Sequence, residues 1–490
     1  MTPAPIKSII ICGTGIAAWM TAAALSKNLP STIKVTVLET PDSDAADIFY
    51  GSVTHPTAYK FNEKLGLTEA DLLMRTQASF SYGTQYENWG LTGASWIQCF
   101  HSPLPVWDGI PIAHHISQYK ENLEHYLVSA QAAAKGKFAH PPPDKNIALS
   151  SAEYGYHIKT SDLTKLMKMI ASKNGVESTA QEIGSIENHD GNIQKLKLKN
   201  GDILTADLYV DASGVQAQIM SNLQENAFRS SRHLGALYSE QQHSQIGAPL
   251  RRLNSGSFGW QSVTPLQGVD ATLTIFDPSS EDEAQKAHIG ETRTRCDVSI
   301  GERRQVWSGN CVALGHAAAI VEPTSPAPIM LLQMDIQRLM ELIPITSDSN
   351  IEAKIFNEAF LTDVENILLF NNAFYHMDNL AKSSYWNAAK THSTSAKLDR
   401  KLKQFSHRGL LVRYDLEPFN DEDWIILHHG MGREAERKDI FAALSDTSKI
   451  SQELKTMSNS IQDIVARMPP HHIYTSKFLN YLERKHVSEL

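Results

Sequence analysis

A glycine turn between a short apolar segment and a helix of small residues constrains the fold of this chain more than any other feature. Residues 9–12 predict a buried strand and residues 16–29 a helix. The first glycine of the turn permits the tight bend, and the second lets backbone amides approach a pyrophosphate at the helix N-terminus. An alanine in the third place still allows the helix to pack closely on the strand. The residues of this GxGxxG-type turn that we expect to contact a dinucleotide are Gly13, Gly15, Ile16, Ala17 and Ala18.

A second strand follows the helix and ends in an acidic residue. Residues 33–38 have the apolar character of a strand, and Glu39 comes at its end, where a carboxylate commonly binds the ribose hydroxyls of an adenosine. An exposed acid at the end of a strand remains the alternative explanation of Glu39. Strand, turn, helix and strand together form a β-α-β unit that opens a parallel sheet. The sequence therefore predicts an α/β protein with a Rossmann-like dinucleotide-binding fold.

Two later segments favour FAD over NAD as the dinucleotide. The segment Tyr209-Val-Asp211-Ala-Ser-Gly214 ends a predicted strand with an acid and a glycine, where flavoprotein chains return to the dinucleotide. In the second segment, a strand leads into Gly315-His316-Ala-Ala-Ala and then to Pro323, and such a turn lets backbone amides reach a ribityl phosphate. It resembles the GDAAH-type segment of aromatic hydroxylase flavoproteins, with His316 in the place of the aspartate. A plain strand-to-helix joint remains the alternative interpretation.

The remaining sequence predicts a flavin-binding part followed by a mainly helical part. We expect residues 1–340 to form the FAD-binding domain, with a substrate-binding region interleaved at about 51–160 and 225–300. Within it, residues 163–173 read as a helix, 193–198 and 203–210 as strands, and the proline-rich stretch 104–144 as a surface excursion. Residues 341–490 are expected to be helical, including 351–378 and 453–468, and to cap the substrate site.

Composition excludes several classes of function. The net charge of -9 argues against a nucleic-acid-binding protein, which needs a basic face to displace counterions. Four cysteines without a CxxC pair predict neither a disulfide framework nor a zinc site, and the reducing cytoplasm is the expected compartment. The apolar stretch 8–25 contains the glycine turn, so we interpret it as part of the fold rather than as a signal or membrane segment.

Several motifs together resemble one enzyme family, the flavin-dependent tryptophan halogenases. Gly13-Thr-Gly-Ile-Ala-Ala-Trp19-Met20 looks like the family's GGGTAGWM opening, and Gly51-Ser-Val-Thr-His-Pro56 lies where the family has GEATIP. Ala78-Ser-Phe-Ser81 with Trp89 is similar to its ATFK…W stretch, and Val321-Glu-Pro323 to its VEP. The resemblance covers nearly the whole chain. It implies a FAD-binding fold of the aromatic hydroxylase and halogenase type, reduced FAD delivered by a separate flavin reductase, molecular oxygen (O2), an aromatic substrate and a homodimer.

The departures from this family fall on its chemical positions. The family uses a lysine, assisted by a glutamate, to direct the oxidised halogen to the substrate, and here Ser81 and Ser325 stand in these two places. A serine hydroxyl can neither carry a haloamine nor supply a cationic donor. The Ser-Thr-Gly that follows the glutamate becomes Pro326-Ala-Pro328, which loses a backbone N–H that could face a halide. Of the family's WxWxIP, only Trp260 and Pro265 remain.

Three functions stay open on this sequence. The first is a flavin-dependent monooxygenase that passes oxygen directly to an aromatic, indole-like small molecule. The second is a halogenase with a rearranged site, using Lys60 or another lysine. The third is a flavin-binding protein without catalysis. Candidate catalytic residues are Ser81, Ser325, His55 and His316; Thr54 is a candidate flavin contact; and Trp89, Phe100, Trp260 and Pro265 are candidates to line the substrate pocket.

Overall fold

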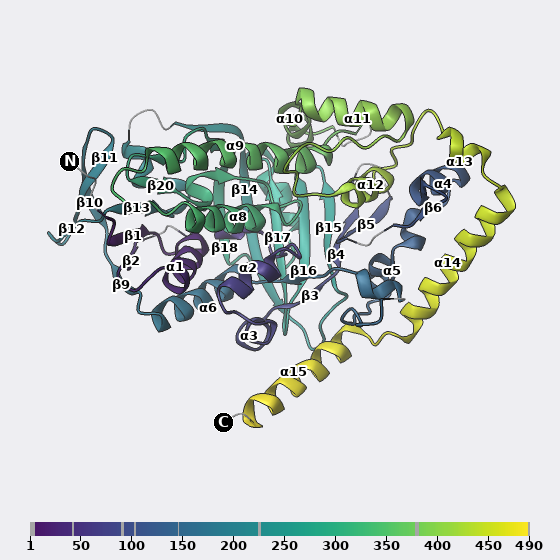
Figure 1. Cartoon of the computed structure of the whole chain (residues 1–490), viewed down its shortest axis with the longest axis horizontal. Helices are drawn as coiled ribbons and strands as arrows, with labels where there is room; N and C mark the ends of the chain where they lie inside the picture. Colours follow the sequence, from purple (N-terminus) through teal and green to yellow (C-terminus); the bar gives the residue numbers. More distant parts are fainter. Residues whose placement is uncertain are drawn as a thin grey trace.

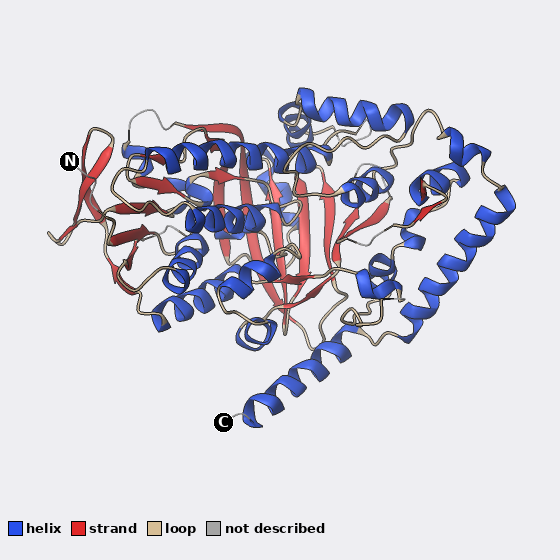
Figure 2. Ribbon diagram, in the orientation of Figure 1, coloured by secondary structure: helices blue, strands red, loops and turns tan. Residues whose placement is uncertain are grey.

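The chain folds around two large β-sheets with helices on their faces (Figures 1 and 2). The computed structural model describes residues 5–41, 44–89, 93–101, 104–145, 147–223, 227–377 and 382–488. The first sheet is the predicted Rossmann-like sheet. Its strand order is β19 (Trp307–Ser308), β20 (Cys311–Ala313), β13 (Leu208–Asp211), β1 (Ser8–Cys12), β2 (Lys34–Glu39) and β9 (Glu177–Ala180). All neighbours in it are parallel except β19 and β20. The predicted α/β fold class is therefore confirmed.

The central strands of this sheet are buried because helices cover them. The strand β1 is almost entirely apolar, as strands with two covered faces require. The helix α1 (Ile16–Asn28) is rich in alanine, so it packs closely beside β1 and β2 and contacts α6 (Thr160–Lys173) and α8 (Ala327–Glu341). Ten consecutive residues at its start are buried, from Ile16 to Leu25. The glycine turn before α1 is thereby held at the carboxyl end of β1.

The second sheet has eight strands and forms the centre of the molecule. Its order is β21 (Ala319–Ile320), β18 (Thr294–Arg303), β14 (Phe228–Gln242), β17 (Val269–Phe276), β16 (Gly259–Pro265), β15 (Leu250–Gly256), β4 (Gly83–Glu87) and β5 (Ser95–Cys99). The sequence did not predict the long strand β14 as an element. Smaller sheets pair β3 (Ser79–Ser81) with β8 (Gly155–His157), β6 (Val106–Trp107) with β7 (Ile110–Pro111), and join β10 (Ile183–His189), β11 (Asn192–Leu198) and β12 (Ile203–Leu204).

The part of the chain that follows β21 is helical. It contains α8, α9 (Asn350–Ala373), α10 (Ser384–His392), α11 (Ala396–Arg408), α12 (Asp421–Gly430), α13 (Ile440–Leu444), α14 (Thr447–Arg467) and α15 (His471–Ser488). The helices α14 and α15 run along the outside of the molecule (Figure 1). The earlier helices are α2 (Ala58–Lys64), α3 (Glu69–Arg75), α4 (Ile112–Tyr119), α5 (Val128–Ala134) and α7 (Glu281–Ala287). None of the helices in the described ranges has the length and apolarity that a bilayer crossing demands.

The proline-rich stretch 104–144 is not the plain surface excursion that the sequence predicted. It contains α4 and α5, and α5 is mostly buried, at Val128, Ser129, Ala130, Ala132 and Ala133. Small side chains explain the difference, because alanines let α5 approach β5 closely. The prolines of this stretch therefore do not keep it at the surface.

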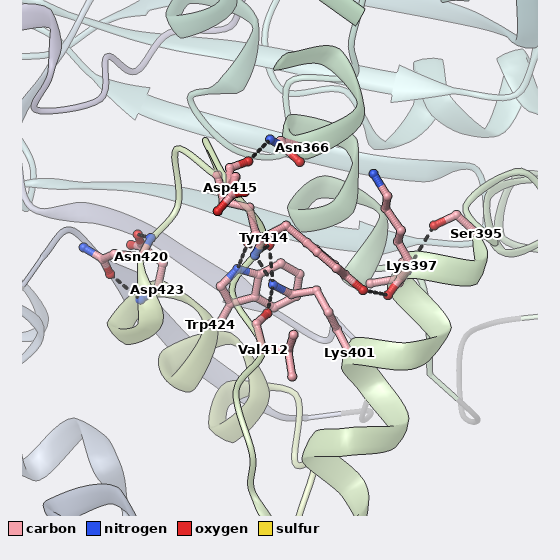
Figure 3. Close-up of polar contacts among 12 residues, drawn as sticks. Asn366, Ser395, Lys397, Lys401, Val412, Tyr414, Asp415, Asn420, Asp423 and Trp424 are labelled. Carbon is pink, nitrogen blue, oxygen red and sulfur yellow. Dashed lines mark hydrogen bonds and ion pairs between the residues drawn. The ribbon is translucent and has the colours of Figure 1, made fainter. Parts of the chain in front are cut away.

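A buried ion pair joins α11 to the loop before α12 (Figure 3). The Lys401 ammonium donates to both carboxylate oxygens of Glu417, at 2.7 and 2.8 Å, and to the carbonyl of Val412 at 2.5 Å. It also lies 4.2 Å from the ring centroid of Trp424, whose indole N–H donates to Glu417 at 3.1 Å. The two charged side chains are only 5% and 1% exposed. This network fixes the start of α12 against α11.

Candidate active site

The glycine turn has the backbone geometry that the sequence predicted. A backbone amide at this turn donates a hydrogen bond to a side chain from elsewhere in the protein. Gly13 has φ +144°, and a Cβ there would lie 2.2 Å from the carbonyl oxygen of Ala212, so only glycine fits. The N–H of Ile16, at the start of α1, donates to the Asp47 carboxyl at 2.7 Å. A Cβ on Gly15 would meet the same carboxyl at 2.5 Å. Burial of this carboxyl group raises the pKa of Asp47 to about 8, although the hydrogen bond from Ile16 opposes the shift.

A second amide of the predicted flavin site is occupied in the same way. Gly315 begins the turn after β20 with φ +60°, and a Cβ there would lie 2.1 Å from the hydroxyl oxygen of Tyr50. The N–H of His316 donates to that hydroxyl at 3.0 Å. The rings of Tyr50 and His316 are stacked, with centroids 3.9 Å apart. Asp47 and Tyr50 are the first and last residues of one 3-10 turn, Asp47–Tyr50.

His316 is a buried, neutral imidazole, so its contribution to the stability of the fold depends on pH. Burial lowers its pKa to about 3, and neither ring nitrogen has a hydrogen-bond partner among the described residues. The unfolded chain takes up a proton here below about pH 6.5 and the folded chain does not. The stabilisation is therefore present above that pH and is lost as the pH falls toward 3.

We expect His316→Phe, which keeps the stacking on Tyr50, to lose less thermal stability than the native protein between pH 7 and pH 5. An equal loss in both proteins would contradict this.

The other predicted flavin contacts lie near the two glycine turns. Glu39 ends β2, as predicted, and its carboxylate is paired with Lys168 of α6 at 2.7 Å. Gly214 has φ +68° and begins a turn that contacts the Gly315 turn. Asp211, in contrast, is engaged by its own loop: it accepts hydrogen bonds from the Ser213 amide and hydroxyl and from the amides of Ile219 and Met220. This places Asp211 in a structural role.

The predicted catalytic serine and several neighbours gather around the small sheet of β3 and β8. Ser81 is fully buried, and its hydroxyl donates to the carbonyl of Gly83 at 3.3 Å. The loop that carries Thr54 and His55 pairs with β8, because the Thr54 amide donates to the Tyr156 carbonyl at 2.9 Å. The His55 ring lies edge-on to Phe100, with centroids 5.8 Å apart, and burial of the ring lowers the pKa of His55 to about 4.

A histidine that sequence reasoning missed lies beside Ser79, two residues before Ser81. Ser79 and Ser81 point to one face of β3, and His157 of β8 is paired directly with Ser79. The Nδ1 of His157 lies 3.1 Å from both the Ser79 hydroxyl and the carbonyl oxygen of Pro265. That carbonyl can only accept, so this hydrogen bond places the proton on Nδ1 and leaves Nε2 as an acceptor, which has no partner among the described residues. Burial lowers the pKa of His157 well below 6.5.

Ser325, in the glutamate's place, joins two helices. Its hydroxyl donates to the Asn371 side chain at 2.6 Å and accepts from the Ala327 amide at 3.2 Å, so it links the start of α8 to α9. Just before it, the carbonyl of Pro323 accepts from the buried guanidinium of Arg251 at 2.8 Å, and that of Thr324 accepts from the same group. Arg251 thus covers the segment in which the resemblance places a flavin contact.

The four predicted pocket residues have different surroundings. Trp89 is buried against Tyr86 and Trp386, and its indole N–H donates to the Phe374 carbonyl at 2.8 Å. Trp260 donates to the buried carboxylate of Glu322 at 2.6 Å, a carboxylate that also pairs with Arg232. Only Phe100 and Pro265 lie beside the β3–β8 sheet. Two clefts of about 570 and 540 Å³ are lined by other residues.

Two lysines that a rearranged halogenase could use have other surroundings in the structure. Lys60 is exposed on α2. The buried lysine among the described residues is Lys401, and its ammonium is committed to Glu417.

The amides of the two glycine turns fit the phosphate-bearing part of a flavin dinucleotide. The observation that shows this is the acceptor oxygen already bound at each turn, Asp47 on the Ile16 amide and Tyr50 on the His316 amide. A phosphate oxygen makes the same kind of hydrogen bond at the N-terminus of a helix. The local pattern did not signal Asp47 or Tyr50, because both lie in a loop after Glu39 without a distinctive spacing.

Comparison with known proteins agrees with this fold. The model of the family described as tryptophan halogenase matches residues 8–447, so this chain belongs to the tryptophan halogenase family. Tryptophan 6-halogenase ThaL of Streptomyces albogriseolus is 25% identical over 456 residues, covering 85% of this chain and 84% of ThaL. Tryptophan 7-halogenase RebH of Lentzea aerocolonigenes is 24% identical, with 79% of each chain covered.

A solved structure is still more similar over the whole length. BrvH, a flavin-dependent halogenase from Brevundimonas sp. BAL3, superposes with a TM-score of 0.89 and 27% identity, covering 96% of this chain and 99% of BrvH. The resemblance predicted from the motifs is thereby confirmed at the level of family and fold. The homologues are flavin-dependent enzymes, and this chain shares their oxidoreductase scaffold.

Proposed function

We propose that this chain is a flavin-dependent monooxygenase that oxygenates an aromatic, indole-like small molecule, with reduced FAD from a separate reductase and O2 as co-substrates. The observation that supports oxygen transfer over halogenation is the buried serine, Ser81, at the position where the resemblance places the family's lysine. When bound, FAD would supply the activated oxygen. Gly13, Gly15, Ile16, Glu39 and Gly315 would hold the dinucleotide, through backbone amides and the Glu39 carboxylate.

His157 is the residue of this site that is best arranged to move a proton. Its Nδ1–H is held by the carbonyl of Pro265, which keeps the ring in one tautomer and leaves Nε2 as a proton acceptor. A phenol or indole loses a ring or heteroatom proton when oxygen is added, and a neutral imidazole can take it. Because the pKa of His157 is lowered, the ring stays neutral below pH 6.5, and the activity should persist there.

Turnover with and without bromide tests this proposal. We expect the purified protein, supplied with reduced FAD and O2, to add one oxygen atom to members of an indole and phenol panel at a rate that bromide does not change. His157→Gln should lower the rate by about 10²–10⁴-fold, the usual range for loss of a general base. Ser81→Ala, at a buried hydroxyl without a proton-transfer partner, serves as the matched control and should stay within about threefold.

Each of the other functions has its own signature in the same assay. Brominated product whose formation requires bromide would replace the proposal by a halogenase with a rearranged site. FAD binding without turnover on any substrate would point to a flavin-binding protein without catalysis. A homodimer and a cytoplasmic location also belong to this proposal, the first from the resemblance to the family and the second from the cysteine usage.

A further inference from the structure

The guanidinium of Arg251 is buried without a carboxylate partner among the described residues. The side chain lies on β15, and Arg251 is 1% exposed. Its printed hydrogen bonds go to neutral acceptors, the carbonyls of Pro323 and Thr324. Its Nε has no hydrogen-bond partner within the described part of the chain. Buried charges in proteins are normally paired, so this one predicts an anion that the chain itself does not supply.

The groups packed around this guanidinium do not compensate its charge. The neighbour that opposes the lowering of the pKa of Arg251 by burial is the hydroxyl of Tyr86. That hydroxyl donates to the Thr324 carbonyl at 2.7 Å, and burial raises its pKa, so it stays neutral. His157 is neutral as well, because burial and the nearby charge of Arg251 lower its pKa. The surroundings of Arg251 therefore keep a net positive charge.

Two other buried arginines have an acid close by. Arg232 pairs with the carboxylate of Glu322. The charge of Asp211 opposes the lowering of the pKa of Arg303 by burial. Burial of an arginine in this protein is thus compatible with a counter-ion from the chain, and its absence at Arg251 is a property of that position.

The position of Arg251 connects the proposed proton acceptor to the flavin site. Its charge acts on His157, and its Nη1 donates to the carbonyl of Pro323 at 2.8 Å. A Cβ on Gly51 would lie 3.9 Å from the same Nη1. Gly51 borders the cleft of about 540 Å³, and so does Asp47, the acceptor at the first glycine turn. Only a residue without a side chain therefore separates the guanidinium from a cleft that reaches the flavin site.

We propose that Arg251 supplies the positive charge that makes this site bind the anionic, reduced flavin ring in preference to the neutral, oxidised ring. The inference rests on the proposed function, since it concerns the same flavin site. Reduction by two electrons and one proton leaves one negative charge on the ring at neutral pH, whereas the phosphates carry the same charge in both forms. A positive charge near the ring therefore distinguishes the two forms, which the amides of the glycine turns do not. A protein that receives reduced FAD from a separate reductase needs this discrimination.

Anaerobic binding of reduced and oxidised FAD tests the preference. We expect Arg251→Gln to lower the ratio of the two affinities by about 10–100-fold, the range for a unit charge at about 6–12 Å and an effective dielectric constant of about 20. Arg251→Lys keeps the charge and should retain most of the ratio. Each tenfold change shifts the reduction potential of bound FAD by about 30 mV, so an anaerobic redox titration provides a second readout.

Arg252→Gln is the matched control, because it removes an equal charge from the next residue, which is exposed on the other face of β15. It should leave the ratio of affinities unchanged, and an equal loss in Arg252→Gln and Arg251→Gln would overturn the proposal. Binding of oxidised FAD shows that Arg251→Gln is folded. If Arg251→Gln weakens the binding of both forms to the same extent, Arg251 only supports the fold, and the proposal is wrong.

Two further outcomes separate this proposal from its alternatives. An unchanged ratio in Arg251→Gln, together with loss of the bromide binding that calorimetry detects in the native protein, would assign the guanidinium to a halide and overturn the proposal. FAD binding itself remains in that case. Binding of neither form of FAD to the native protein would refute the proposed function, and the role of Arg251 with it.

Discussion

Replacing Glu417 by alanine should lower the free energy of unfolding by about 3–5 kcal/mol, because Lys401 would then remain buried without its counter-ion. The Lys401 side chain is 5% exposed, and its ammonium has Glu417 as its carboxylate partner. The same carboxylate also accepts from the Tyr414 amide at 2.7 Å and from the indole of Trp424. Its removal therefore leaves two further donors without this acceptor. Urea denaturation of the whole chain measures the change.

Two further variants show how much of the lost stability comes from the charge of Glu417 and how much depends on the burial of the ion pair. Glu417→Gln keeps an acceptor oxygen for Tyr414 and loses only the charge, so its loss of stability should be smaller than that of Glu417→Ala. Glu365→Ala breaks the pair with Lys397 on the same helix, α11, where the two side chains are 50% and 44% exposed. An exposed pair contributes about 0–1 kcal/mol. Equal losses in Glu417→Ala and Glu365→Ala would show that burial does not strengthen the network.

Replacing Asp211 by alanine should cost at least about 3 kcal/mol in the absence of any flavin. The carboxylate accepts four hydrogen bonds, and three of the donors are buried backbone amides, at Ser213, Ile219 and Met220. A buried donor left without a partner costs about 1–3 kcal/mol. The loss appears in the flavin-free protein because the acceptor serves the loop itself. Thermal denaturation without FAD is the measurement.

Asp207, four residues earlier, provides the comparison for Asp211. Its carboxylate accepts from the Lys7 and Ser8 amides and from the Ser8 hydroxyl, but at the partly exposed edge of the sheet. Water can replace this acceptor, so Asp207→Ala should cost only about 1 kcal/mol. If Asp211→Ala is as stable as Asp207→Ala without flavin and differs only when FAD is added, Asp211 is a cofactor ligand as the sequence predicted, and its structural role is refuted.

Local sequence patterns were sufficient to predict the elements whose geometry depends on their own residues. The strand, glycine turn and helix from Ser8 to Asn28 agree with the prediction within a residue, since glycine alone tolerates the close approach at Gly13. The helix periods of α6, α9 and α14 were likewise visible. The strand predicted at residues 203–210 divides into β12 and β13, and β14 was missed, because neither the break nor the long strand has a clear period in the sequence.

The sequence by itself determined the family and the α/β scaffold, because these depend on residue identity at fixed spacing along the chain. Tertiary structure alone decided which side chains meet: Asp47 with Ile16, Tyr50 with His316, and Ser79 with His157. These partners are 31, 266 and 78 residues apart. Such contacts arise only when the sheets pack and bring their loops together, because no local period or turn preference links residues so far apart in the chain.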